Sequence, residues 1–240
     1  GDAAIFSLQI NKNITAGEGG VIVTRDPELH RRINALHNAG YAPDTANPCN
    51  WYGDMPVGWG HGRRMSELQG ALARVQLTKL DTILAHMRRS HARLETTVRA
   101  LGMTPRARAD QANPGDTGYY CLFRLPPGPE GEQAKIERGR DVARALEPFG
   151  LHPWFLHDFE VHVYYNIQPL VEKWSIGNGC PWDCPRNTFH QYYHYERGTL
   201  PRLDEDLITT VGINVPSRMT AEQEDRIVQV LEQVLRRDSL

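Results

Sequence analysis

The pattern that most constrains the fold is a long run of apolar residues with helical spacing that begins just after Ser66. Apolar side chains recur every three or four positions along it: Leu68, Leu72, Val75, Leu80, Ile83, Leu84, Met87, Leu94 and Val98. Ser66 and Gln69 have the spacing of a helix capping box, and Gly102 ends the run. A helix of about 35 residues would be roughly three times the average length, so we expect it to bend.

Strands and shorter helices are predicted on both sides of this run. Short apolar runs that end at turn residues predict strands over 3–6, 20–24 and 118–125, and the first is expected to be buried. A helix is predicted between Asp26, its N-cap, and Gly40, with Pro27 in its first turn. Further helices are predicted over 133–148 and 221–237, the second behind a capping box of Thr220 and Gln223. This alternation indicates an α/β fold.

Composition excludes several classes of protein. The 240 residues suffice for one or two globular domains, and a net charge of −2 without a long basic run argues against nucleic acid or an anionic membrane as partner. No apolar run approaches the roughly 20 residues of a bilayer span, and no leader pattern predicts secretion. The four cysteines are too sparse for a disulfide framework, so we expect free thiols in a cytoplasmic protein. Zinc at Cys180 and Cys184 is the less favoured interpretation, because no second pair accompanies them.

Lys12 is the strongest candidate for chemistry. It is one of only four lysines among 27 lysine and arginine residues, and it lies just past the predicted strand at 3–6. A lysine that is partly desolvated can lose its proton and condense with a carbonyl, which arginine cannot do. The common alternative is a solvated lysine after a strand. The glycines at 17, 19 and 20 look like a phosphate loop, but they lack the lysine and helix start of a P-loop and more simply supply positive φ angles for a turn.

The segment from Phe6 to Gly20 resembles the lysine segment of the DegT/DnrJ/EryC1/StrS family of sugar aminotransferases, which use pyridoxal phosphate. The resemblance continues in the family's order through residues 20–24, 26–36, 64–69, 76–81, 195–198, 214–216 and 219–223. It implies the fold type I of pyridoxal-phosphate-dependent transferases, similar to aspartate aminotransferase. Residues 1–65 would be the end of the large cofactor-binding domain, and residues 66–240 the small C-terminal α/β domain.

The resemblance also implies roles for individual residues. Lys12 would form the Schiff base with the cofactor, and Ser7 would place a hydroxyl on the cofactor phosphate. Gln9 would orient the lysine or the substrate. The long loop at 41–62 would reach the other subunit of a homodimer with shared active sites. The family has an asparagine where this chain has Gly62. Its contact with the phosphate in the neighbouring subunit would therefore come from backbone amides, from His61 or from Arg63, or would be missing. A solvated pair of arginines at 63 and 64 is the alternative interpretation.

By the resemblance, the family's substrate-facing segment would fall over 154–165. This run has both the aromatic faces and the neutral donors that a sugar site requires. His162 and Tyr164 are the candidates there. His190 and His194 do not form a recognised metal spacing.

The hypothesis that follows is a pyridoxal-phosphate-dependent aminotransferase. It would transfer an amino group from glutamate or glutamine to a keto sugar, nucleotide-linked, or to a related keto-cyclitol. Dehydratase members of the family carry histidine at the lysine position, so Lys12 argues against dehydration but leaves cyclisation open. A generic nucleotide-binding module is the weakest alternative.

The chain begins at Gly1, inside what the family would make the large domain. The phosphate-binding turn, the ring-stacking aromatic and the aspartate for the pyridine nitrogen would all lie upstream. The chain is therefore expected to be a piece of a longer protein or to need a separate polypeptide that carries the missing half. A non-catalytic subunit or fragment is the alternative from another functional class.

Overall fold

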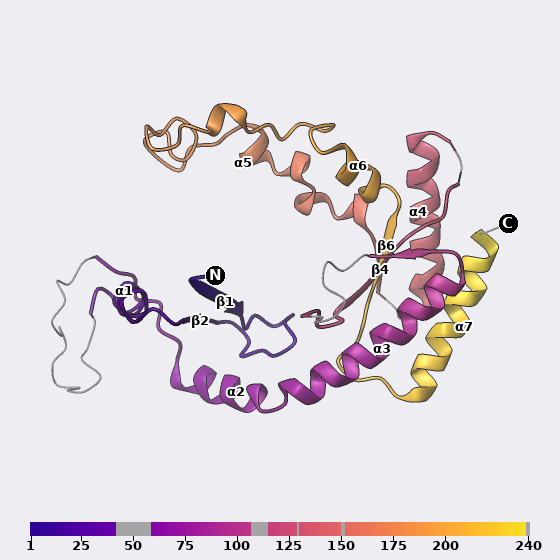
Figure 1. Ribbon diagram of the computed structural model, residues 1–240, viewed down its shortest axis with the longest axis horizontal. Helices are drawn as coiled ribbons and strands as arrows, with labels where there is room; N and C mark the ends of the chain where they lie inside the picture. The colour runs from indigo at the N-terminus through magenta and orange to yellow at the C-terminus, as the bar shows by residue number, and fades with distance from the viewer. Residues whose placement is uncertain (42–58, 107–114, 129, 150–151, 239–240) are drawn as a thin grey trace. The chain divides into compact units, whose positions relative to one another are not determined.

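The computed structural model describes residues 1–41, 59–106, 115–128, 130–149 and 152–238 (Figure 1). These residues divide into two compact units, Gly1–Ile83 and Leu84–Leu240, each of which is described by itself. The predicted loop at 41–62 falls mostly outside the described residues. None of the described helices combines the length and apolar character that a membrane span requires.

The first unit consists of an antiparallel hairpin and two helices. Strands β1 (Ala3–Ser7) and β2 (Gly20–Thr24) pair so that Ile5 lies opposite Ile22. Helix α1 (Pro27–His37) begins at Asp26, whose carboxylate accepts hydrogen bonds from the backbone N–H groups of Glu28 and Leu29. The predicted N-cap is therefore confirmed. The helix ends at Asn38, and Gly40, at φ +92°, donates its N–H to the carbonyl of Ala35.

The predicted burial of the first strand is wrong for this chain. All five side chains of β1 are exposed, including Ile5 and Phe6. Within the unit, β1 pairs with β2 alone. Of the other described elements, α1 has the main contact with this hairpin, and it contacts β2. A strand becomes buried only when a second layer covers it, and the apolar sequence alone does not supply that layer.

The long helical run is divided into two helices. Helix α2 (Glu67–Leu77) starts at the Ser66–Gln69 capping box, and α3 (Leu80–Ala100) follows after Thr78 and Lys79. The hydroxyl of Thr78 donates to the carbonyl of Val75, so it occupies one of the last carbonyls of α2. The expected bend is confirmed as a break, and Gly102 at φ +84° ends the run as predicted.

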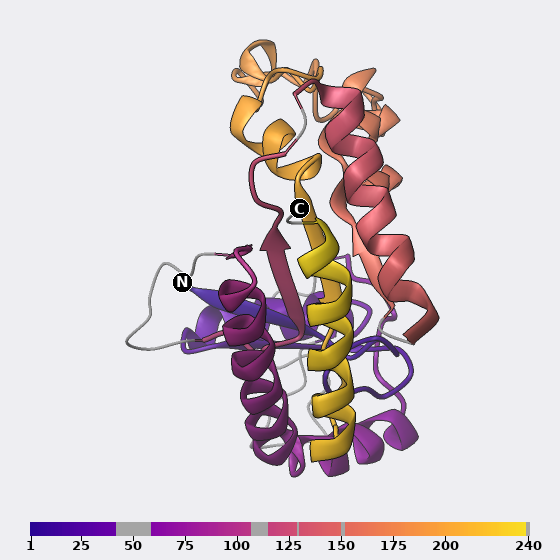
Figure 2. The same cartoon turned by 90° about the vertical axis from the view of Figure 1, so that its right-hand side faces the viewer.

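The second unit has a four-stranded antiparallel sheet in the order β3-β4-β6-β5. Its strands are β3 (Thr104–Pro105), β4 (Tyr120–Arg124), β5 (Pro153–Phe155) and β6 (Thr210–Asn214). Its longer helices are α4 (Glu132–Leu146) and α7 (Ala221–Asp238), with α3 (Figure 2). Short elements complete it: η1 (Glu147–Phe149), η2 (Leu156–Asp158), η3 (Glu160–His162), η4 (Tyr164–Asn166), α5 (Gln168–Val171), η5 (His190–Tyr192) and α6 (Pro201–Leu207).

The core lies between one face of this sheet and the helices. Alternate strand residues point into it, among them Phe123, Phe155 and Val211, and they pack against apolar residues of α3, α4 and α7. On the opposite face Gly212 lies across from both Leu122 and Trp154 in the strand register. A Cβ at Gly212 would come 2.6 Å from Leu122 Cδ2, so the absence of a side chain there lets its neighbours meet.

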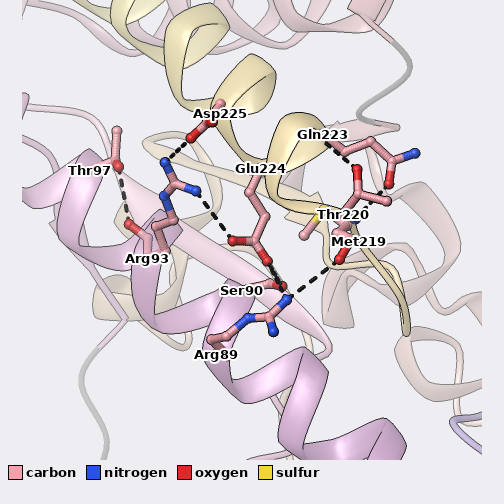
Figure 3. Close-up of polar contacts among 9 residues, drawn as sticks. All are labelled: Arg89, Ser90, Arg93, Thr97, Met219, Thr220, Gln223, Glu224 and Asp225. Atoms are coloured by element: carbon pink, nitrogen blue, oxygen red, sulfur yellow. Dashed lines mark hydrogen bonds and ion pairs between the residues drawn. The ribbon is translucent and has the colours of Figure 1, made fainter.

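A buried carboxylate joins α3 to the start of α7 (Figure 3). Glu224 accepts hydrogen bonds from Ser90 Oγ at 2.7 Å, from Arg89 at 3.0 Å and from Arg93 at 3.3 Å. Burial alone would raise the pKa of Glu224, but these hydrogen bonds outweigh that effect and lower it. Thr220 and Gln223 form the predicted second capping box immediately before it.

Candidate active site

Lys12 lies in a loop whose ends are fixed by backbone hydrogen bonds. The N–H of Leu8 donates to the carbonyl of Gly19 at 2.9 Å, and the N–H of Ala16 donates to the carbonyl of Leu8 at 3.0 Å. Leu8 and Ala16 are the buried residues of this part of the chain. Thr15 adds a hydrogen bond from its hydroxyl to the same Leu8 carbonyl at 3.0 Å. The loop therefore has a small apolar base and a defined backbone path.

The side chain of Lys12 extends from this loop. Its backbone N–H donates to the carbonyl of Gln9 at 2.9 Å, which closes a tight turn over residues 9–12. The residue is exposed, and no ion pair holds its ammonium group among the residues that the structure describes. The described residues therefore give Lys12 a fixed backbone and an unengaged amine, but they do not desolvate its side chain.

Gln9 lies in the same loop as Lys12, and Ser7 is the last residue of β1, directly before this loop. The Ser7 hydroxyl oxygen accepts a hydrogen bond from the Gln9 N–H at 3.3 Å, which leaves its own proton available to an acceptor such as a phosphate oxygen. The amide oxygen of Gln9 accepts from the Asn11 N–H at 3.0 Å. Gln9 thus shapes the turn that carries Lys12, and its predicted contact with lysine or substrate stays a prediction.

The glycines of the loop act as turn residues. Gly17 has a φ of +83° and Gly19 a φ of +145°, which confirms the positive φ angles expected at these two positions. The same expectation is wrong for Gly20, which is the first residue of strand β2. A Cβ at Gly19 would lie 2.9 Å from the terminal methyl carbon of Met65. The backbone of the loop is therefore close to the residues that precede α2.

Gln69 connects the loop to α2, and the sequence did not reveal this role. Its amide oxygen accepts from the Ser66 N–H at 3.1 Å, and its amide nitrogen donates to the carbonyl of Glu18 at 3.0 Å. The capping pattern predicted the first contact and gave no indication of the second, which spans 51 positions. The only signal in the sequence is that the capping residue is Gln and not Glu.

His61 and Arg63 are placed beside α1 by backbone hydrogen bonds. The N–H of His61 donates to Leu36, and the N–H of Arg63 donates to His37 at 2.9 Å. Gly62 forms an isolated bridge with Asn38. Both side chains are exposed, and the structure does not bring them into hydrogen-bond contact with the Lys12 loop in the described residues. Their predicted role toward a neighbouring subunit is untested by this single chain.

His162 and Tyr164 belong to the second unit. His162 is exposed, and its ring packs edge-on against Phe159 with centroids 4.6 Å apart. The Tyr164 hydroxyl donates to Asp204 at 2.9 Å and accepts from the Leu200 N–H at 3.3 Å. Burial and the nearby Asp204 carboxylate raise the pKa of Tyr164. Tyr164 therefore holds the start of α6 in place, and a role toward substrate stays a prediction for both residues.

A cavity of about 290 Å³ lies beside the predicted substrate-facing segment. Trp154 and Phe159 line it with their rings, whose centroids are 5.3 Å apart. Arg140 also lines it and donates two hydrogen bonds from Nε and one from Nη2 to Asp158, which lower the pKa of that carboxyl. The cavity thus combines aromatic faces with a fixed ion pair, but neither His162 nor Tyr164 is part of its lining.

Comparison with known proteins identifies relatives of one kind. The sequence profile of the DegT/DnrJ/EryC1/StrS aminotransferase family matches residues 1–134. The L-glutamine:2-deoxy-scyllo-inosose aminotransferase of Streptomyces fradiae is 35% identical over 129 residues, which are 52% of this chain and 30% of that protein. The protein of the same name from Streptomyces kanamyceticus is 31% identical over 187 residues, which are 72% of this chain and 42% of that protein. The chain therefore spans less than half the length of these relatives.

Solved structures of the same kind share the fold. The putative sugar aminotransferase Spr1654 from Streptococcus pneumoniae in its PMP form superposes with a TM-score of 0.68 at 15% identity, covering 98% of this chain and 53% of that one. DesI in the presence of its TDP-sugar product superposes with a TM-score of 0.65 at 22% identity, covering 99% and 50%. These likenesses show the predicted fold type I, of which this chain represents about half.

Proposed function

The chain belongs to the DegT/DnrJ/EryC1/StrS aminotransferase family, and on that basis we propose that it carries the catalytic lysine of a pyridoxal-phosphate-dependent aminotransferase. The observation that supports this most directly is Lys12. It lies inside the matched stretch, on a loop with a fixed base, and its side chain is exposed and without an ion pair in the described residues.

The residues around Lys12 fit the cofactor. An aldehyde needs an amine that can lose its proton, and a phosphate needs donors that add no negative charge. Lys12 Nζ supplies a primary amine, and the Ser7 hydroxyl can donate its proton to a phosphate oxygen while its own oxygen accepts from the Gln9 N–H. When it is bound, pyridoxal phosphate supplies an electron-withdrawing ring that stabilises negative charge at the carbon from which a proton is removed.

The chain's own residues would then act in two ways. Lys12 Nζ would bind the cofactor covalently, and as a free amine it would hold and move a proton at the reacting carbon. The turn over residues 9–12 would limit the movement of this amine, because the Gln9 carbonyl and the Gln9 amide oxygen bond the Lys12 and Asn11 backbones.

The amino acceptor in this proposal is a ketone on a polyhydroxylated six-membered ring. The relatives named above act on 2-deoxy-scyllo-inosose with L-glutamine, and GDP-perosamine synthase of Caulobacter vibrioides is 36% identical over 102 residues. A keto-cyclitol with glutamine as donor is accordingly the first acceptor to test, and a nucleotide-linked keto sugar the second.

Exposed apolar side chains support a partner or further chain around the first unit. Ile5 and Phe6 on β1, and Leu68, Leu72 and Val75 on α2, are all exposed. Exposed apolar side chains of this kind are typical of an interaction site. We expect an upstream half, on the same or a separate polypeptide, and a homodimer with shared active sites to cover it. The same observation favours a second candidate function, in which the isolated chain is an inactive portion.

The proposal is tested on the full-length protein, meaning this chain together with the expected upstream half on the same or a separate polypeptide. Replacing Lys12 with alanine is expected to abolish both the visible absorbance of the bound cofactor and amino transfer to 2-deoxy-scyllo-inosose. Lys79→Ala is the matched control, because Lys79 is exposed between α2 and α3. Equal activity in the Lys12 variant and the control would remove Lys12 from the proposed role.

A further inference from the structure

The Gln69 side chain both accepts and donates hydrogen bonds, a combination that a glutamate side chain could not provide. Its oxygen accepts from the Ser66 N–H at 3.1 Å and from the Ser66 hydroxyl at 3.0 Å, while its nitrogen donates to the Glu18 carbonyl at 3.0 Å. A capping box accepts Glu or Gln at this position, because capping requires only an acceptor. A carboxylate could not donate to Glu18. The tether to the loop therefore requires the glutamine.

The chain contains a second capping box that lacks this feature. Gln223 accepts from the Thr220 N–H at 2.9 Å, and its own N–H donates to Thr220 Oγ1 at 3.2 Å, as in the first box. Among the described residues, the amide nitrogen of Gln223 does not donate to a backbone carbonyl from a distant part of the sequence. The two boxes thus perform the same local task, and the contact with Glu18 distinguishes Gln69.

The hydrogen bond from Gln69 to Glu18 lies at the end of the Lys12 loop that leads into β2. Glu18 directly precedes Gly19, whose carbonyl accepts from Leu8 and closes the loop. Gly19 also lies against Met65, since a Cβ there would come 2.9 Å from the Met65 methyl carbon. Helix α2 has no buried residue. Gln69 in its first turn and Met65 just before its N-cap both contact this loop.

We infer that Gln69 is a positioning residue for Lys12, which it serves by tying the Glu18–Gly19 backbone to the start of α2. This inference rests on the proposed function of Lys12, but the tether itself is a property of the fold. It restricts the loop to one path and so limits the positions that the lysine amine can take. Neither the capping pattern nor the role of Lys12 requires such a contact.

Gln69→Glu tests the tether without removing the cap. Glutamate keeps the acceptor for Ser66 and suits the first turn of a helix, but it sets a carboxylate against the Glu18 carbonyl. Hydrogen exchange of the amides of Leu8 and Ala16 is expected to rise about threefold to tenfold in the full-length protein, as for one lost hydrogen bond. Gln223→Glu, the matched control, should leave these two amides unchanged.

A second readout separates positioning from general stability. Gln69→Glu is expected to lower kcat while KM for the amino donor and the melting temperature stay near those of the parent protein. Ser66→Ala weakens the cap but keeps the hydrogen bond from Gln69 to Glu18. Hydrogen exchange of the Leu8 and Ala16 amides should therefore rise less in Ser66→Ala than in Gln69→Glu. Unchanged exchange at Leu8 and Ala16 in Gln69→Glu, or an equal rise in Gln223→Glu, would overturn the inference. If the tether responds as expected but Lys12→Ala retains activity, the proposed function alone fails.

Discussion

Replacing Glu224 with alanine is expected to lower the free energy of unfolding of the unit at 84–240 by about 2–3 kcal/mol. The Glu224 side chain is 6% exposed, and its removal deprives the Ser90 hydroxyl, on a residue that is 1% exposed, of its acceptor. A buried polar group that loses its partner costs about 1–3 kcal/mol. Arg89 and Arg93 are more than a third exposed, so their ion pairs with Glu224 add little beyond this.

Asp225→Ala is the matched control for this prediction. Asp225 lies in the same turn of α7 and also pairs with Arg93, but its side chain is 58% exposed (Figure 3). Asp225→Ala is expected to lower the free energy of unfolding less than Glu224→Ala does, because water readily replaces an exposed partner. Urea denaturation followed by tryptophan fluorescence measures both variants. An unfolding midpoint for Glu224→Ala no lower than that of Asp225→Ala would refute the reasoning.

The same network predicts how stability depends on pH. The pKa of Glu224 is lowered from its ordinary value of 4.5. A carboxyl whose pKa is lower in the folded state contributes stability above its unfolded pKa and loses it as the pH falls through the folded pKa. Acidification from pH 5 to about pH 3 should therefore narrow the difference in stability between the parent protein and Glu224→Gln.

Three further predictions concern glycines and cysteines. Gly139→Ala should destabilise the second unit by about 1–3 kcal/mol, because the new Cβ would lie 2.3 Å from the Phe155 ring, and thermal unfolding measures the loss. Gly70→Ala, at a helical position where nothing lies within 4 Å of the new Cβ, should instead stabilise α2 by up to about 1 kcal/mol, and a lower melting temperature would contradict this. Burial raises the pKa of Cys121 to about 12, so a thiol reagent at neutral pH should modify exposed Cys180 and spare Cys121 until the protein is denatured, as peptide mass analysis would show.

Local signals in the sequence predicted the elements well. The caps at Asp26, Ser66 and Thr220 and the stop at Gly102 all act over a few residues, so the chemistry that sets them is contained in short segments. The position of the break between α2 and α3 was not predictable in the same way. Apolar spacing continues across Thr78 and Lys79, and only the actual hydrogen bonds show where the helix ends.

Contacts between distant segments could not be predicted from one sequence. β1 has the composition of a buried strand, yet burial depends on a covering layer that its own residues do not specify. The bond from Gln69 to Glu18 crosses 51 positions and has no periodic or motif signal. For Lys12 the sequence supplied the residue, and the structure adds the fixed loop that carries it. The cofactor-binding assignment of residues 1–65 remains a prediction.

The most direct test of the central claim is to locate the cofactor on the chain. The full-length protein is incubated with pyridoxal phosphate, reduced with borohydride and digested, and the pyridoxyl group is assigned by mass among Lys12, Lys79, Lys135 and Lys173. Attachment confined to Lys12 is the predicted result. Attachment to any of the other three lysines in preference to Lys12, or to none of the four, would contradict the account.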